Sequence, residues 1–235
     1  MKNQNAIVPT NDTQIQTKET FALSTDLNFG DELQGLKLVY ERIKVPAGGG
    51  LAYEVPGDDA ESPDMLKEFK AVVLHSHPVN AFYLEKFSGG NESPDCSSID
   101  GKVGTDKATG KVKACKDCAY NQWGSGEGEK GKACKEKRRL FLLLEGNVIP
   151  VLFTLPTTSI PVFAQYATRL LGRGKAPSRV VTKFSLKKDT STDGIVYSKV
   201  VLNTERDLTA GELSSIQPVI LQVKSAGAIA DDGDE

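Results

Sequence analysis

Long apolar runs are absent from this sequence, and so is an apolar leader segment. No stretch approaches the roughly 18 apolar residues that a membrane-spanning helix requires, which argues against an integral membrane protein. The first twenty residues are polar and lack the apolar centre of a secretory signal peptide. We therefore expect a cytoplasmic protein that has no membrane partner.

A large excess of charge of one sign is absent as well. The formal net charge is −2, so overall charge gives no argument for nucleic-acid binding. The local distribution is uneven, because eleven Lys or Arg stand against six Asp or Glu between Cys96 and Arg139. The chain then ends in an acidic tip that contains Asp231, Asp232, Asp234 and Glu235. This tip is expected to compete with nucleic acid for the basic residues or to recruit partner proteins, or simply to keep the chain soluble.

Cysteine is missing from most of the chain. All four cysteines fall within 39 residues, with the spacing C-x18-C-x2-C-x15-C: Cys96, Cys115, Cys118 and Cys134. A disulfide framework would normally spread its cysteines through a small secreted domain. This clustering, in a chain without a secretory signal, indicates a metal site and a reducing compartment.

The central Cys115-Lys116-Asp117-Cys118 turn can aim two thiolates at one point, and the outer cysteines complete a four-cysteine set. Four soft thiolates suit tetrahedral Zn²⁺ and leave no open coordination position, so the predicted zinc is structural. Metal binding would organise a segment that has little apolar core of its own. Two alternatives stay open, namely four unrelated thiols and an iron–sulfur cluster, which usually has tighter cysteine spacing.

The order of elements predicts a mixed, β-dominated (α+β) fold. Strand-like alternation, two hairpins and two short C-terminal helices suggest an OB-like barrel with an inserted zinc-ribbon-like module. The first helix is expected to be capped by Thr158 or Ser159, with Pro161 in its first turn, and the second to begin at the capping box Thr209-Ala210-Gly211-Glu212. The predicted organisation is a flexible arm at 1–32, an OB-like domain at 33–224 with the zinc insert at about 88–137, and a disordered acidic tail at 225–235.

Aromatic and basic residues interleave in and around the insert. Proteins that bind single strands need cations along the backbone path and flat rings on which bases stack. The candidate stacking residues are Trp123, Tyr120 and Phe82, and the candidate phosphate contacts are Lys113, Lys116, Lys132, Lys135, Arg138 and Arg139. The alternatives are that Phe82 belongs to the core and that Trp123, the only tryptophan, packs on the zinc module.

Two further constellations have weaker support. His75 and His77 share one face of a strand, where they form either part of a second metal site or a half-buried pair. Asp64, Glu68 and Lys70 match a Mg²⁺ nuclease pattern, but the three residues between Asp64 and Glu68 are too few for the strand pair that it needs. Since no nucleotide-binding motif or spare nucleophile occurs, we expect a protein that is not an enzyme.

The chain resembles the single-stranded-DNA-binding proteins of bacteriophage replication and recombination modules. The resemblance lies in the strand series, the four-cysteine insert, the acidic tip and the flanking stretches Asn121-Gln122-Trp123-Gly124-Ser125 and Gly131-Lys132-Ala133-Cys134-Lys135. It implies sequence-independent coating of single-stranded DNA in the cytoplasm of a bacterial host cell. It also implies recruitment of replication or recombination proteins through the acidic tail.

A protein-interaction module is the rival interpretation. Zinc modules of this size also hold protein partners, as in a recombination directionality factor or a transcription regulator. This rival predicts weak DNA binding that is indifferent to strandedness, together with tight binding to a protein. In either case, edge strands and an extended arm leave formation of a homo-oligomer open.

Overall fold

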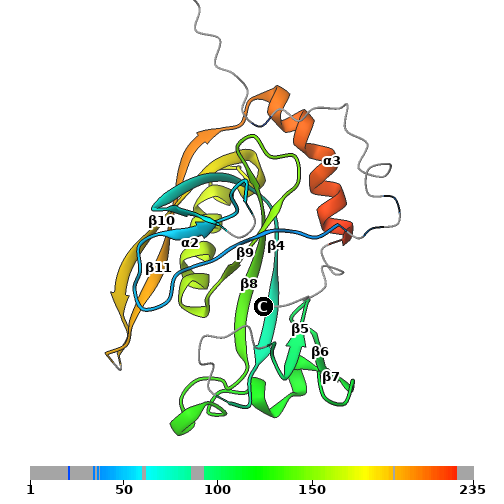
Figure 1. The fold of residues 1–235 in the computed structure, drawn as a ribbon, viewed down its shortest axis with the longest axis vertical. Helices are drawn as coiled ribbons and strands as arrows, with labels where there is room; N and C mark the ends of the chain where they lie inside the picture. The colour runs from blue at the N-terminus through cyan, green and yellow to red at the C-terminus, as the bar shows by residue number, and fades with distance from the viewer. Residues whose placement is uncertain are drawn as a thin grey trace, which may run out of the picture.

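The computed structural model describes Phe21, Gln34, Leu36 and residues 38–59, 62–85, 93–192 and 194–226 (Figure 1). The predicted acidic tail, with Asp231, Asp232, Asp234 and Glu235, lies outside the described residues. So does most of the predicted N-terminal arm. No described helix is long and apolar enough to cross a membrane.

Eleven strands and two α-helices make up the regular structure of the described residues. The strands are β1 (Arg42–Ile43), β2 (Tyr53–Val55), β3 (Asp64–Leu66), β4 (Glu68–Phe82), β5 (Cys96–Ser98), β6 (Val103–Asp106), β7 (Val112–Ala114), β8 (Lys135–Leu144), β9 (Val151–Leu155), β10 (Val180–Thr190) and β11 (Val196–Asp207). The helices are α2 (Ile160–Leu171) and α3 (Ala210–Ala226). The mixed, β-dominated class predicted from the sequence is therefore confirmed.

The long strand β4 organises the main sheet. Along one edge it pairs with β8, which continues to β9 and β1. Along the other edge its first five residues pair with β10, whereas its last three residues pair with β5, which continues to β6 and β7. In Figure 1, β4 and β8 therefore run together from the helix-covered part of the molecule into the lower part that holds β5, β6 and β7.

Three parts of the molecule follow from this topology. We call the helix-covered part the core lobe, and residues 93–134 the cysteine module. The neck is the segment where residues 75–81 of β4 pair with residues 135–141 of β8. The neck joins the cysteine module to the core lobe; β9 flanks residues 138–141 of β8 at its upper end, and β5 flanks residues 80 and 81 of β4 at its lower end.

The sheet of the core lobe is buried on both faces. Phe69, Ala71 and Val73 of β4 point to the face covered by α2, and the alternate residues Val72 and Leu74 point to the face covered by α3. From α2, the residues Phe163, Tyr166 and Leu170 complete the first cluster; from α3, Ile216, Ile220 and Val223 complete the second. Burying both faces of a sheet between helices is a layered arrangement.

The predicted OB-like barrel is not confirmed. A barrel closes only when its first and last strands pair. In the part of the chain that the structure describes, β1, β7 and β11 each pair on one side only, so the sheet is open. The apolar side chains are buried by the two helices instead of by closure of the sheet.

Both predicted helices are present. In α3 the capping box forms, since the Glu212 N–H donates to Thr209 Oγ1 at 3.2 Å and the Thr209 N–H donates to Glu212 Oε2 at 2.8 Å. In α2, Pro161 occupies the first turn. Ser159 does not cap α2 with its side chain but accepts a hydrogen bond from the Val200 N–H of β11 at 3.1 Å.

Phe21 is the one described residue of the predicted flexible arm, and it is buried. Its side chain is 2% exposed and belongs to the apolar cluster under α3. Its N–H donates to Glu212 Oε1 at 3.3 Å, and the Arg206 guanidinium lies 5.9 Å from the centroid of its ring. At this position the arm is anchored to the core lobe.

Candidate nucleic-acid interface and cysteine site

Two neighbouring strands of the sheet bring distant cysteines to one place. Cys96 begins β5 and lies opposite Phe82 at the end of β4. Cys134 comes directly before β8, whose first residue pairs with Ala81 of β4. The strand register of β4 therefore positions the outer two cysteines of the motif.

The four cysteines line one cavity of about 260 Å³ in the cysteine module. Cys115 and Cys134 are buried, Cys96 and Cys118 are half-buried, and all four are free thiols. A Cβ atom at Gly104 would lie 3.1 Å from the Cys96 sulfur and 3.5 Å from the Cys115 sulfur. The absence of a side chain at Gly104 gives these two sulfurs the room to face each other.

The four thiols also influence one another electrostatically. Burial and, to a lesser extent, the neighbouring thiols Cys115, Cys118 and Cys96 together raise the pKa of Cys134 to about 11. The pKa of Cys96 is raised by the same two causes. A bound divalent cation would offset this mutual repulsion of thiolates, so the donor set fits a soft divalent metal.

The described residues nevertheless include no group of three or more His, Cys, Asp or Glu side chains in metal-holding geometry. The zinc site accordingly stays a prediction. The structure brings the four cysteines to one cavity.

Polar side chains of the stretch after Cys118 hold the cysteine module together. Asn121 donates from Nδ2 to the Cys115 carbonyl at 2.9 Å, and Gln122 donates from Nε2 to the Lys116 carbonyl at 2.9 Å. Ser125 Oγ accepts from the Ala133 N–H at 3.0 Å, and the Cys134 N–H donates to the Tyr120 carbonyl at 2.8 Å. Sequence reasoning missed these roles, although Asn and Ser beside a tight turn commonly bind the backbone.

The three candidate stacking residues have different environments. Phe82 is buried, with its ring stacked on that of Tyr120 at a centroid distance of 4.2 Å and an interplanar angle of 19°. Tyr120 is 47% exposed and Trp123 is 82% exposed. Trp123 therefore does not cap the cysteine cluster, and Phe82 supports Tyr120 from beneath.

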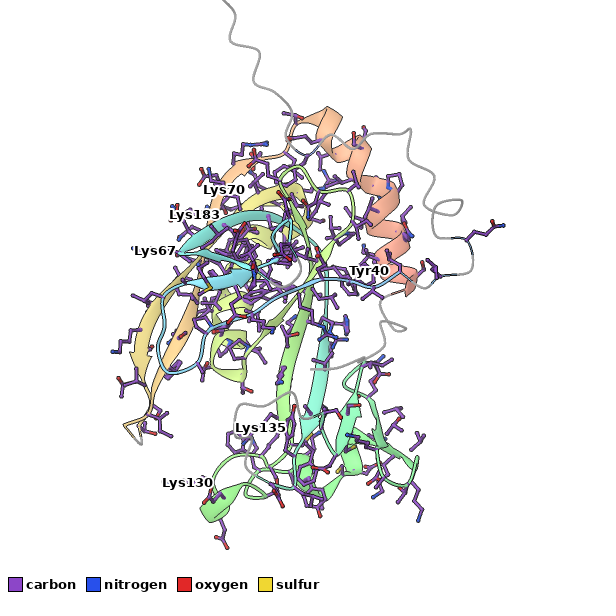
Figure 2. All side chains as sticks on the ribbon, in the orientation of Figure 1. Tyr40, Lys67, Lys70, Lys130, Lys135 and Lys183 are labelled. Atoms are coloured by element: carbon purple, nitrogen blue, oxygen red, sulfur yellow. The ribbon has the colours of Figure 1, made fainter. Side chains whose placement is uncertain are left out.

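Four of the six candidate phosphate contacts are lysines of the cysteine module or its border. Lys113, Lys116 and Lys135 are exposed, and Figure 2 shows Lys130 and Lys135 in the lower part of the molecule, at the opposite end from Lys67 and Lys70. Lys132 is half-buried and donates to Asn121 Oδ1 at 3.3 Å.

The two arginines belong to the neck instead. Arg138 donates from Nε to Ser76 Oγ at 3.1 Å, and its guanidinium lies 5.5 Å from the centroid of the Phe163 ring. Arg139 is only 1% exposed. The structure therefore does not favour direct contact between Arg139 and a phosphate, because its side chain is enclosed by the fold.

The nuclease-like residues lie at the other end of the molecule. Glu68 accepts from Lys183 at 2.9 Å, and Lys70 donates to Glu205 at 2.7 Å, so each forms an ion pair across the β4, β10 and β11 strands. Asp64 lies on β3 in a separate two-stranded sheet. This arrangement gives Glu68 and Lys70 partners other than a shared Mg²⁺ site.

No protein family, curated protein or solved structure matches this chain. The functional argument therefore depends on the geometry of the chain itself.

Proposed function

We propose that this protein binds single-stranded DNA without sequence preference, that it does so without catalysing a reaction, and that the cysteine module is its main contact surface. The observation that carries the proposal is the 82% exposure of Trp123 on a module whose cysteines, not an apolar core, form its centre. An exposed ring beside exposed lysines is the combination that proteins binding single strands use.

Single-stranded DNA matches the chemistry of this surface. Its unpaired bases stack on exposed rings, and its backbone attracts lysine side chains. Trp123 and Tyr120 provide the rings, and Lys113, Lys116 and Lys135 provide exposed cations on the same module. Duplex DNA hides its base faces, so a surface of this kind favours single strands.

Zinc has a structural role in this proposal. Cys96, Cys115, Cys118 and Cys134 would hold the ion, and four thiolates leave it no open position for catalysis. The metal would stabilise a module that contributes no residue between 83 and 134 to either large apolar cluster of the described chain.

The resemblance to phage single-stranded-DNA-binding proteins suggests the process and the compartment in which this protein would act. The protein would act in replication or recombination in the cytoplasm of a bacterial host cell. The acidic tail would recruit partner enzymes, and self-association would help it to coat a strand. An OB-like arrangement would describe the core lobe only loosely, because the described sheet is open.

The decisive experiment is a titration of the purified protein with oligothymidylate and with a duplex of equal length, at two salt concentrations, following Trp123 emission. We expect tight, salt-sensitive binding to the single strand together with quenching of Trp123. The titration is repeated with Lys116→Ala, which removes an exposed lysine of the cysteine module. Lys67→Ala is its matched control, because Lys67 is exposed on the core lobe, away from that module.

Equal binding to both nucleic acids, or binding to neither, would refute the proposal. The exposed Trp123 would then be explained better by a protein partner. Pull-downs with the wild-type chain and with Trp123→Ala would test that rival directly.

A further inference from the structure

His75 and His77 lie side by side on the neck, on the face of the sheet that α3 covers. Their ring centroids are 5.9 Å apart and their planes are inclined by 23°. Both rings pack against Phe141, at centroid distances of 6.3 Å and 5.9 Å, and Phe141 belongs to the cluster under α3. Both histidines are half-buried, so each ring rests on Phe141 and keeps part of its surface open to solvent.

A local irregularity of β4 places this pair on the face under α3. The register between β4 and β8 shifts between Val73 and His75, after which His77 lies directly opposite Arg139. Residues directly opposite on antiparallel strands point to the same face. Arg139 is therefore beside the histidine pair, and Lys137, two residues away on β8, shares that face.

The charged groups that act on the two imidazoles are cationic in the part of the chain that the structure describes. They come from two elements, namely Arg138 and Arg139 on β8 and Lys224 in the last turn of α3. The other titratable groups on this face are Lys137 and Tyr40, whose ring meets Phe141 edge-on at 5.5 Å. No carboxylate of the described residues acts on the pair.

This environment disfavours a metal ion and favours an anion. A cation bound by the imidazoles would be repelled by the arginines and by Lys224. The described residues also offer no third metal ligand beside the pair. An anion would meet attraction from the same groups, and the His75 imidazole can donate to it; His77 cannot, because its Nδ1 lies 3.1 Å from the Pro78 carbonyl and its Nε2 is buried, with no hydrogen-bond partner among the described residues.

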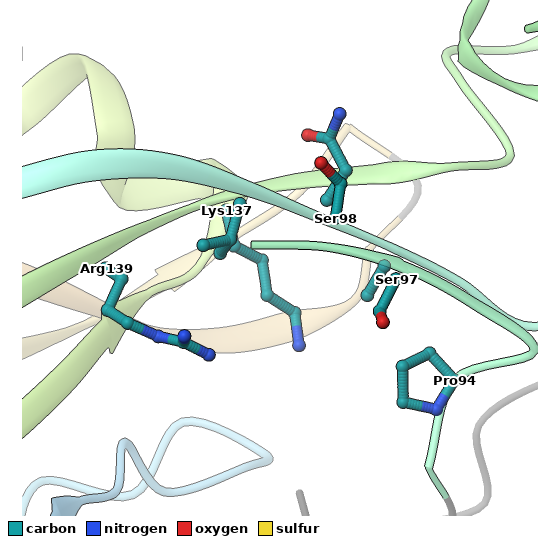
Figure 3. Close-up of a pocket in the computed structure, with 8 residues that line it drawn as sticks. Pro94, Ser97, Ser98, Lys137 and Arg139 are labelled. Carbon is teal, nitrogen blue, oxygen red and sulfur yellow. The ribbon is translucent and has the colours of Figure 1, made fainter. Parts of the chain in front are cut away.

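We propose that this face of the neck binds a phosphate group, with His75 and Lys224 at its surface and the charges of His77 and Arg139 beneath. The inference builds on the proposed function, because the phosphate source that we favour is the backbone of the bound single strand. Figure 3 shows that Lys137 and Arg139 leave β8 on one side, toward Ser97 and Pro94, around a small pocket next to this face. That pocket, with a volume of about 10 Å³, is too small for a phosphate, so the group would lie on the surface over the imidazoles.

The site makes binding depend on pH. Burial first, and then the nearby cations, hold the pKa of His75 below its usual value. Burial also lowers the pKa of His77, partly offset by the hydrogen bond between its Nδ1 and the Pro78 carbonyl. Since a bound phosphate favours the charged imidazolium, the pKa of each histidine would rise on binding, and affinity would increase as pH falls.

The test uses the fact that the chain has only two histidines. With untagged protein, the two imidazole C2–H signals can be followed by NMR as a function of pH and assigned with His75→Gln and His77→Gln. The titration is repeated with saturating oligothymidylate, and with sodium sulfate against sodium chloride at equal ionic strength. Sulfate serves as a phosphate-like probe whose charge is constant over this pH range.

We expect oligothymidylate to raise at least one histidine pKa by about one unit, which corresponds to about tenfold tighter binding to the fully protonated than to the neutral imidazole, and to a smaller gain, about sixfold or less, between pH 8 and pH 6. The double variant His75→Gln/His77→Gln should lose this pH dependence. Lysine, arginine and phosphodiesters keep their charge in this range, so they cannot supply it.

Unchanged histidine titration while oligothymidylate quenches Trp123 would overturn the inference and leave the proposed function intact. A pKa rise with sulfate in a protein that binds no oligothymidylate would support the anion site, assign it to a free phosphate-like ligand, and refute the proposed function. If neither probe moves the histidines and no strand binds, both proposals fail.

Discussion

Phe82 of β4 and Tyr120 of the cysteine module stack face to face, with ring centroids 4.2 Å apart. This contact joins the last residue of the longest central strand to the short helical turn after Cys118. The stacked rings of Phe82 and Tyr120 orient the cysteine module relative to the neck, and this contact involves no cysteine. Trp123, three residues along, is 82% exposed.

Trp123→Ala should weaken binding of oligothymidylate by about 1 to 3 kcal/mol, or roughly 5- to 150-fold, because a base loses its stacking partner. Fluorescence anisotropy with a labelled oligonucleotide measures this loss, since the variant has no tryptophan. The free energy of unfolding should change by less than about 0.5 kcal/mol, as for an exposed residue. Unchanged affinity would exclude Trp123 from the interface.

Tyr120→Ala should act on both stability and binding. Losing the stacked contact with Phe82 should cost about 1 kcal/mol beyond the loss of buried area. Tyr120→Phe keeps the ring and serves as the matched control, with nearly wild-type unfolding. Thermal unfolding and anisotropy on the three proteins separate the two effects, and equal behaviour of Tyr120→Ala and Tyr120→Phe would contradict the structural role.

Removal of the predicted zinc should unfold the cysteine module and leave the core lobe folded. The two large apolar clusters draw on no described residue between 83 and 134, so their packing does not require the metal. Hydrogen exchange after chelation should rise in residues 93–134 while residues 69–74 and 140–144 stay protected. Elemental analysis should give one zinc per chain, and about half of that or less in Cys118→Ser; an absence of bound metal in the wild-type protein would refute the site.

Lys116→Ala should lower the salt dependence of binding. Each phosphate contact to a single strand contributes about 0.7 to the slope of log affinity against log salt concentration. The slope should fall by about that amount in Lys116→Ala and stay unchanged in Lys67→Ala, whose lysine lies on the core lobe. Equal slopes in all three proteins would place the bound strand away from Lys116.

Glu212→Gln should destabilise the core lobe by about 2 to 3 kcal/mol at pH 7, because its carboxylate bonds Arg206 and the Thr209 and Phe21 N–H groups. The side-chain hydrogen bond from Arg206 is the main cause that lowers the pKa of Glu212 to about 2. A lowered carboxyl pKa stabilises the fold above the unfolded value near 4.5, and this stabilisation is lost as pH falls toward 2.

Urea unfolding at pH 7 and pH 3 measures this effect. The difference between the wild type and Glu212→Gln should shrink at pH 3, since much of the carboxylate's advantage is gone there. Glu205→Gln is the control, because its ion pair with Lys70 is largely exposed and should contribute less than about 1 kcal/mol. A constant difference at both pH values would show that the charge of Glu212 does not matter.

Local features were predictable from the sequence. The Thr209–Glu212 capping box and Pro161 at the start of α2 act over a few residues, so they require no knowledge of the rest of the fold. The apolar run at residues 71–74 also indicated that the sheet is buried on both faces and does not expose one face to solvent. A continuous apolar strand is typical of a sheet buried on both sides.

The environments of single side chains were not predictable. Arg138 and Arg139 are neighbours in the sequence, but successive residues of a strand point to opposite faces, so one packs on Phe163 and the other is enclosed beside His77. Composition alone made them look like equivalent phosphate contacts. Phe21 likewise lies in a polar segment, and only its contact with α3 reveals it as an anchor.

The sequence by itself determined the short-range chemistry of this protein, namely the clustering of its cysteines, its helix starts and the aromatic and basic content of the module. These depend on spacing along the chain. The tertiary structure decided the open, two-faced sheet, the exposure of Trp123, the burial of Arg139 and the pairing of His75 with His77 over Phe141. Each of these depends on which distant strands pair and in which register, and that is set by packing over the whole chain.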